Sequence, residues 1–116
     1  MAGRAALALL CALAGAGALA AAARPLSGSE LFARRDKGNC IACHQVPQGA
    51  GPATRSDLGP KLEGARMRAI GRERLRTLLT DPMANNPETL MPPFGRHRIL
   101  DAAQIERVID YLYALP

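Results

Sequence analysis

The chain has 116 residues, with 15 Lys and Arg against 10 Asp and Glu, which allows one small basic domain and excludes a multidomain enzyme. Only four aromatic side chains are present, two Phe and two Tyr, so the hydrophobic core is thin. Domains of this size often need a disulfide, a metal or a cofactor to stabilise so small a core. The composition therefore predicts a bound group.

A hydrophobic leader opens the chain. Residues 1–4 are short and positively charged, and residues 5–23 are 19 uncharged Ala, Leu, Gly and Cys ending in three alanines before Arg24. This pattern is typical of a cleaved signal peptide, although an uncleaved anchor of this length would also just span a bilayer. We expect cleavage, which makes residues 1–23 a signal peptide and residues 24–116 a periplasmic domain with no stable membrane insertion.

Removal of the leader takes Arg4 with it and leaves 14 basic side chains against 10 acidic ones. This moderate excess, in an exported chain without a basic motif interleaved with aromatics, does not favour nucleic-acid binding. A negatively charged protein or cofactor is the expected partner.

Three helices are predicted, and no stretch alternates apolar and polar residues with a period of two, so the expected fold is all-α. Ser27 and Glu30 have the spacing of a capping box, which starts a helix expected over residues 28–36 and ended by Gly38. A second helix is expected over residues 71–80, with leucines on one face, because the proline after Asp81 stops it.

The last predicted helix begins after Asp101, which repeats the capping spacing with Gln104, and reaches about Leu115. Its apolar residues follow the i, i+3, i+4, i+7 pattern of a buried helix face. They are Ile105, Val108, Ile109 and Leu112.

Two long loops separate these helices. Residues 45–64 are too rich in Pro and Gly for regular structure, and a second loop runs from Asp81 to Arg98. Loops of this length in a small domain usually have a function or wrap a bound group. We expect the cofactor to lie between them.

Residues 40–44 read Cys-Ile-Ala-Cys-His, the signature of c-type haem attachment. On one helical turn the two sulfurs lie on the same side, where each forms a thioether to a haem vinyl group, and His44 is placed to coordinate the iron. The alternatives are a disulfide between Cys40 and Cys43, a thioredoxin-type redox pair and half of a zinc site. A thioredoxin motif needs a preceding strand, and zinc needs four ligands, of which only His44 and the distant His97 would join the cysteines.

The sixth iron ligand is predicted to be Met91. It opens a Met-Pro-Pro-Phe turn, whose prolines stiffen the backbone and so hold a thioether in place. Met83, which follows a proline in the same loop, is the second candidate, and His97 would give bis-histidine ligation. Met67 lies among arginines and is predicted to be a surface residue.

The segment Gly-Pro-Lys-Leu-Glu-Gly at residues 59–64 resembles the Gly-Pro-x-Leu-x-Gly segment of class I cytochromes c. In that family the proline carbonyl accepts a hydrogen bond from the proximal imidazole, which fixes the ring. The resemblance implies this role for Pro60, and a fold of three to four helices around one covalently bound haem c with long haem-wrapping loops.

Four further segments closely resemble the SoxX family, the small monohaem subunits of SoxAX cytochromes: residues 38–44, 81–82, 86–95 and 97–100. The most specific is Asn-Pro-Glu-Thr-Leu-Met-Pro-Pro-Phe-Gly, at 86–95. Residues 48–57 and 66–68 depart from any pattern of that family. The resemblance implies a heterodimer with a larger SoxA-like cytochrome subunit, which oxidatively joins thiosulfate to a cysteine of a sulfur-carrier protein. The small subunit would accept electrons and pass them to a downstream cytochrome.

The residues themselves support only the electron-transfer part of this role. Once Cys11 is removed with the leader and Cys40 and Cys43 form thioethers, no free thiol remains, so this chain has no catalytic sulfur nucleophile of its own. A free-standing electron-shuttle cytochrome c is the alternative function. The arginines between residues 66 and 76 are predicted either to form a solvated helix face or to bind haem propionates or a partner.

Overall fold

The computed structural model describes residues 22–116, and within this range the chain forms helices and turns without any strand. The all-α prediction is therefore confirmed. Residues 1–21 of the predicted signal peptide lie outside the described range. The elements are α1 (Gly28–Ala33), the 3-10 turn η1 (Cys40–Ala42), α2 (Gly64–Ile70), α3 (Arg72–Thr80), the 3-10 turn η2 (Pro82–Ala84) and α4 (Ala102–Ala114). Between residues 22 and 116, none of the helices is both long enough and apolar enough to cross a membrane.

Both predicted capping boxes are present. The Ser27 hydroxyl accepts a hydrogen bond from the Glu30 N–H at 3.2 Å, and the Ser27 N–H donates to the Glu30 carboxylate at 2.8 Å. Asp101 and Gln104 make the same reciprocal pair at the start of α4, at 2.8 and 2.9 Å. Each pair satisfies two backbone donors that a helix start leaves free, so the sequence signal and the structure agree.

The first helix ends earlier than predicted, at Ala33 instead of Asp36. Beyond Ala33 the chain turns back on itself, because the Gly38 N–H donates to the Leu31 carbonyl at 3.0 Å and the Asn39 N–H donates to the Arg34 carbonyl at 3.0 Å. These bonds satisfy carbonyls that the last helical turn leaves free. The early end brings the Cys-x-x-Cys-His segment back against α1.

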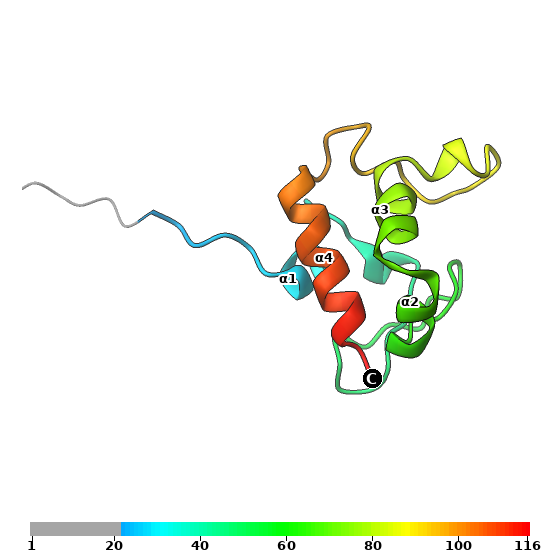
Figure 1. Cartoon of the computed structure of the whole chain (residues 1–116). Coiled ribbons are helices and arrows are strands. Elements are labelled where there is room, and N and C mark those ends of the chain that lie inside the picture. Colours follow the sequence, from blue (N-terminus) through cyan, green and yellow to red (C-terminus); the bar gives the residue numbers. More distant parts are fainter. Residues whose placement is uncertain (1–21) are drawn as a thin grey trace, which may run out of the picture.

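Helix α4 is the centre of the packing, with α1 against one side of it and α2 and α3 against the other (Figure 1). The predicted apolar stripe is its buried face. Val108 and Ile109 are completely buried, and so is Leu31 of α1. The rest of the core comes from the other helices and the second loop, and includes Phe32, Leu75, Leu79, Phe94 and Leu100.

Helix α2 was not predicted, and the prediction that Met67 is a surface residue is wrong. Met67 is 2% exposed and belongs to the core, while Arg66 and Arg68 on either side of it are exposed. Gly64 reads as a helix breaker in the sequence, but here it begins the helix. A Cβ at Gly64 would lie 1.8 Å from the carbonyl oxygen of Leu115, so only glycine allows α2 to start against the end of α4.

Three of the five arginines between residues 66 and 76 hold α2 and α3 against α4 through contacts with α4 or the residue that caps its end, and Arg72 also lies over the Tyr113 ring at 4.7 Å. Arg66 and Arg74 are exposed, as expected for a solvated helix face. The contacts are Arg68 to the Tyr113 carbonyl at 2.7 Å, Arg72 to the Asp110 carboxylate at 2.6 Å and Arg76 to the Glu106 carboxylate at 2.5 Å.

Helices α1 and α4 cross with almost no space between their backbones. A Cβ built on Gly28 would lie 2.0 Å from the Arg107 carbonyl oxygen and 2.8 Å from the Tyr111 Cβ. Because the nearest obstacle is backbone, no side-chain rotation relieves it. The crossing therefore requires glycine at residue 28.

Replacing Gly28 with alanine is expected to lower the free energy of unfolding by about 1–3 kcal/mol, because the helices must separate to admit the methyl group. Thermal unfolding followed by far-UV circular dichroism measures the change. Ser29→Ala, at the exposed neighbouring position of α1, is the control and is expected to change stability by less than about 0.5 kcal/mol. Equal stability of the two variants would contradict the close crossing.

Candidate functional site

The Cys-x-x-Cys-His segment lies on η1 and the residues that follow it. The His44 N–H donates to the Cys40 carbonyl at 2.8 Å, so the segment is a single hydrogen-bonded turn. Asn39 starts the turn in the left-handed conformation, with φ of 48°. Cys40 and Cys43 are both free thiols and both half-buried. The turn keeps two thiols and an imidazole together within five residues.

The environment of Cys40 does not suit a redox-active dithiol. Burial raises the pKa of the Cys40 thiol to about 12, so the sulfur is protonated at neutral pH. A thioredoxin-type pair needs a thiol with a lowered pKa, at the end of a strand, and residues 22–116 contain no strand. A zinc site finds no support either, since no cluster of three or more His, Cys, Asp or Glu side chains occurs in that same range.

The His44 ring is held by the first loop. Its Nδ1 lies 2.7 Å from the Pro60 carbonyl oxygen. A carbonyl oxygen only accepts, so Nδ1 carries the proton and donates, and the lone pair remains on Nε2. A metal-binding histidine usually makes this kind of bond, which fixes both the tautomer and the orientation of the ring. The hydrogen bond implied by the class I resemblance is thus present in the structure.

Backbone hydrogen bonds fix the loop that carries Pro60. The Gly59 N–H donates to the Cys43 carbonyl and the Leu62 N–H donates to the Gln45 carbonyl, both at 2.8 Å. The loop therefore runs directly beside the Cys-x-x-Cys-His turn. These two bonds flank Pro60, so they fix the carbonyl oxygen that accepts the hydrogen bond from the His44 imidazole.

Gly59 is a site residue that the sequence analysis did not identify. A Cβ at Gly59 would lie 2.4 Å from Cε1 and 2.7 Å from Nδ1 of His44, so the glycine backbone packs directly against the imidazole ring. The Gly-Pro pair in the sequence pointed to the proline carbonyl. It gave no sign that the glycine contacts the ring, which becomes visible only in three dimensions.

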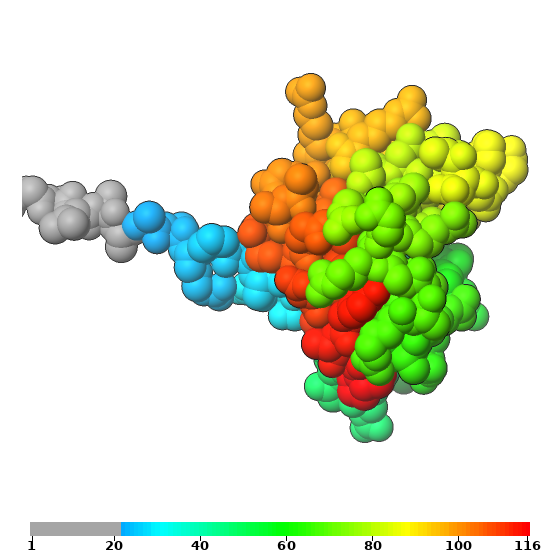
Figure 2. Space-filling model, viewed as in Figure 1, coloured from blue at the N-terminus to red at the C-terminus, as the bar shows by residue number. Residues whose placement is uncertain are grey.

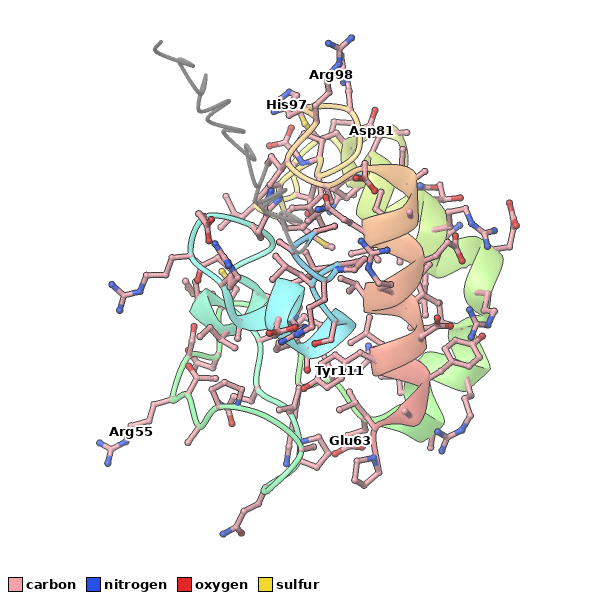
Figure 3. All side chains as sticks on the ribbon, turned by 90° about the vertical axis from the view of Figure 1, so that its left-hand side faces the viewer. Arg55, Glu63, Asp81, His97, Arg98 and Tyr111 are labelled. Carbon is pink, nitrogen blue, oxygen red and sulfur yellow. The ribbon has the colours of Figure 1, made fainter. Side chains whose placement is uncertain are left out.

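Tyr111 is a second residue that the sequence analysis did not single out. Its hydroxyl donates to the Ala50 carbonyl at 2.8 Å, and its ring packs on Phe32 with 5.2 Å between the centroids. Figure 3 shows Tyr111 reaching from α4 toward the first loop. The residue therefore ties that loop to the α1–α4 crossing.

The four candidates for a second iron ligand lie in different surroundings. Met91 is half-buried and packs against the core, and its N–H donates to the Thr89 hydroxyl at 3.2 Å. Met83 is 39% exposed, and Met67 is buried in the core. His97 is exposed at the far end of the molecule beside Arg98 (Figure 3). Of the four, Met91 combines a partly buried thioether with a stiff, hydrogen-bonded loop.

The residues present fit a c-type haem. Two free thiols three residues apart suit the two thioethers, and the tautomer of His44 leaves Nε2 available for iron. Two leucines on the loops are far more exposed than large apolar side chains usually are, Leu58 at 74% and Leu90 at 88%. Leu58 directly precedes Gly59 on the first loop, and Leu90 directly precedes Met91 on the second loop. An apolar ring bound between the two loops therefore has apolar neighbours.

Replacing Gly59 with alanine is expected to push the His44 ring away and to lengthen its hydrogen bond to Pro60. The imidazole then becomes a weaker donor to oxidised iron, so the reduction potential of the haem-loaded protein rises. A spectroscopic redox titration measures the shift. Gln48→Ala changes an exposed side chain of the same loop and is the control, because it is expected to leave the potential unchanged. A potential unchanged in Gly59→Ala would show that the ring contact does not tune the site.

Comparison with known proteins identifies a family for this chain. The family model described as cytochrome c oxidase, cbb3-type, subunit III matches residues 23–112. The matched range includes all four helices except the last two residues of α4, and every candidate site residue. No curated protein matches the chain.

Proposed function

The chain belongs to the family of cytochrome c oxidase, cbb3-type, subunit III, and from this membership we propose that it carries one haem c bound through Cys40 and Cys43. The family makes it a c-type cytochrome with a redox role, and its helices form a small class I cytochrome c fold. In the proposed site His44 is the proximal ligand and Met91 the distal one. The hydrogen bond from His44 to Pro60 supports the first assignment.

When bound, the haem supplies a one-electron redox centre. The residues of the chain set its properties: Pro60 orients the imidazole, and a methionine thioether at the sixth position favours the reduced iron. The prolines that follow Met91 restrict the loop that would present the thioether to the haem. This set of ligands suits an electron acceptor.

We further propose that the chain is the electron-accepting subunit of a thiosulfate-oxidising heterodimer, located in the periplasm. The observation that carries this proposal is the segment 86–100, which resembles SoxX. The end of this segment, residues 94–100, is a hydrogen-bonded turn, since the Ile99 and Leu100 N–H groups both donate to the Phe94 carbonyl, at 2.9 and 3.1 Å. The hydrophobic leader supports export, which haem attachment of this kind requires.

The thiols of the chain limit what it does in that reaction. Joining thiosulfate to a carrier cysteine forms one sulfur–sulfur bond and breaks one S–H bond, releasing one proton and two electrons. Cys40 and Cys43 are the only cysteines between residues 22 and 116, and both are used by the haem. The sulfur chemistry must therefore occur on a larger cytochrome subunit, and a single haem here takes up the electrons in two transfers.

The Met91→Ala variant is expected to lose the weak red charge-transfer band that marks a methionine thioether bound to oxidised haem iron. The absorption spectrum of the oxidised protein measures it. Met83→Ala removes the other methionine of the same loop and is expected to keep the band. If the band persists in Met91→Ala and disappears in Met83→Ala, Met83 is the ligand.

The chain alone is expected to produce no conjugate from thiosulfate and the sulfur-carrier protein, because it has no thiol to react. Adding the larger cytochrome subunit is expected to start conjugation and to reduce the haem of this chain. Mass spectrometry of the carrier protein and the haem absorption spectrum follow the two events. Conjugation by the chain alone would refute the division of roles.

A respiratory electron carrier without any part in sulfur chemistry is the second candidate, favoured by the oxidase subunit named in the family description. The conjugation assay with the larger cytochrome subunit separates the two functions. A respiratory carrier is reduced by respiratory donors and does not bind the larger subunit. A subunit of the heterodimer binds the larger subunit and is reduced during conjugation.

A further inference from the structure

Gln45, the residue directly after His44, makes two hydrogen bonds to the first loop. Its backbone carbonyl accepts one from the Leu62 N–H at 2.8 Å, and its side-chain Nε2 donates one to the Ser56 carbonyl at 2.8 Å. A backbone carbonyl only accepts, so the amide nitrogen of the Gln45 side chain must face Ser56. Gln45 therefore holds the loop on both sides of Pro60, once before it and once after it.

The stretch of residues 46–58 has few other anchors. Figure 2 shows part of it, in bluish green, at the lower edge of the molecule below the red end of α4. In the described part of the chain, only two hydrogen bonds join this stretch to residues outside it, one from the Gln45 side chain to Ser56 and one from the Tyr111 hydroxyl to Ala50. At the end of the stretch that leads into Pro60, the anchor is therefore the Gln45 side chain.

The backbone of Ser56 is held through both of its polar groups. Its N–H donates to the Thr54 hydroxyl at 3.2 Å, and its carbonyl accepts the hydrogen bond from Gln45. Thr54 and Ser56 are half-buried, whereas Arg55 and Asp57 are exposed, and Figure 3 shows Arg55 extending away from the body of the protein. Thr54 and Ser56 thus lie on the inner side of the loop, where the Gln45 side chain reaches them.

The Pro60 carbonyl depends on such anchors, because the residues next to it restrain it weakly. Proline has no N–H with which to fix its own position. The preceding residue, Gly59, must be a glycine because its backbone packs on the His44 ring, and glycine restricts the backbone less than any other residue. The direction of the Pro60 carbonyl is therefore set by the hydrogen bonds that hold the loop around it, and the Gln45 side chain makes one of them.

We propose that Gln45 is a positioning residue for the proximal iron ligand: its side chain fixes the first loop so that the Pro60 carbonyl keeps its hydrogen bond with His44. Gln45 acts on the iron through Pro60 and the imidazole. A well-held hydrogen bond at Nδ1 makes the imidazole a stronger donor and so favours oxidised iron. The inference rests on the proposed function, since it concerns the ligand of the proposed haem c, and it adds a residue outside the ligand set that tunes the redox centre.

Gln45→Met removes the amide and keeps the length of the side chain. In the haem-loaded chain, the His44 Nδ1 proton of this variant is expected to exchange with solvent about tenfold faster or more, because the carbonyl that accepts it is no longer held in place. The reduction potential is expected to rise, because the imidazole becomes a weaker donor. NMR of the reduced protein with isotope-labelled histidine measures the exchange, and a spectroscopic redox titration measures the potential.

Two controls separate positioning of His44 from general support of the loop. Gln48→Met makes the same chemical change at an exposed residue of the same loop, whose side chain forms no hydrogen bond in the described part of the chain, and both quantities are expected to stay at the wild-type values. Tyr111→Phe removes a hydrogen bond of the same length to the same loop, at Ala50. It is expected to lower the unfolding temperature without changing the exchange of the His44 proton.

Thr54→Val tests the same end of the loop with Gln45 intact. It removes the acceptor of the Ser56 N–H and is expected to shift both quantities in the same direction as Gln45→Met, by a smaller amount. Unchanged exchange and potential in Gln45→Met overturn the proposal, as do equal changes in Tyr111→Phe, while the haem site and the proposed function remain. If Gln45→Met does not fold, unchanged values in Thr54→Val overturn it. If the wild-type chain carries no covalent haem, the proposed function is refuted, and the role of Gln45 with it.

Discussion

The structure depends on the contact between the backbones of α1 and α4, where no side chain separates Gly28 from the Arg107 carbonyl. This crossing places Phe32 of α1 against Tyr111 of α4. Tyr111 in turn holds the first loop through its hydrogen bond to Ala50. The position of that loop therefore follows from how closely two helices approach each other. This aromatic pair therefore links the helix crossing to the loop beside the Cys-x-x-Cys-His turn.

Charge reinforces the same arrangement from the other side of α4. Arg76 of α3 binds Glu106 of α4, and this hydrogen bond holds the pKa of the Glu106 carboxyl below its usual range. A lowered pKa in the folded state means that the pair stabilises the fold above the ordinary pKa of glutamate. That contribution is lost as the pH falls through the lowered value. Because both side chains are about 40% exposed, solvent screening keeps the contribution small.

The sequence identified features that depend on neighbouring residues. Both capping boxes, the apolar stripe of α4 and the Cys40–His44 motif follow from spacings of a few residues, and all are present in the structure. Helix α2 could not be identified in this way. Its first residue is a glycine because the end of α4, about 50 positions later in the chain, lies against it. The packing of Gly59 on His44 was missed for the same reason, since it depends on the fold of an entire loop.

The site has two sides, and they are held by different means. On the His44 side, the hydrogen bond to the Pro60 carbonyl and the contact with Gly59 fix the imidazole. On the Met91 side, the loop is anchored by Phe94 and continues directly into the turn that carries Arg98. The two proposed ligands are therefore held by separate loops, since His44 depends on Pro60 and Gly59 whereas Met91 depends on the loop anchored by Phe94. A change that loosens one loop does not by itself displace the residue on the other.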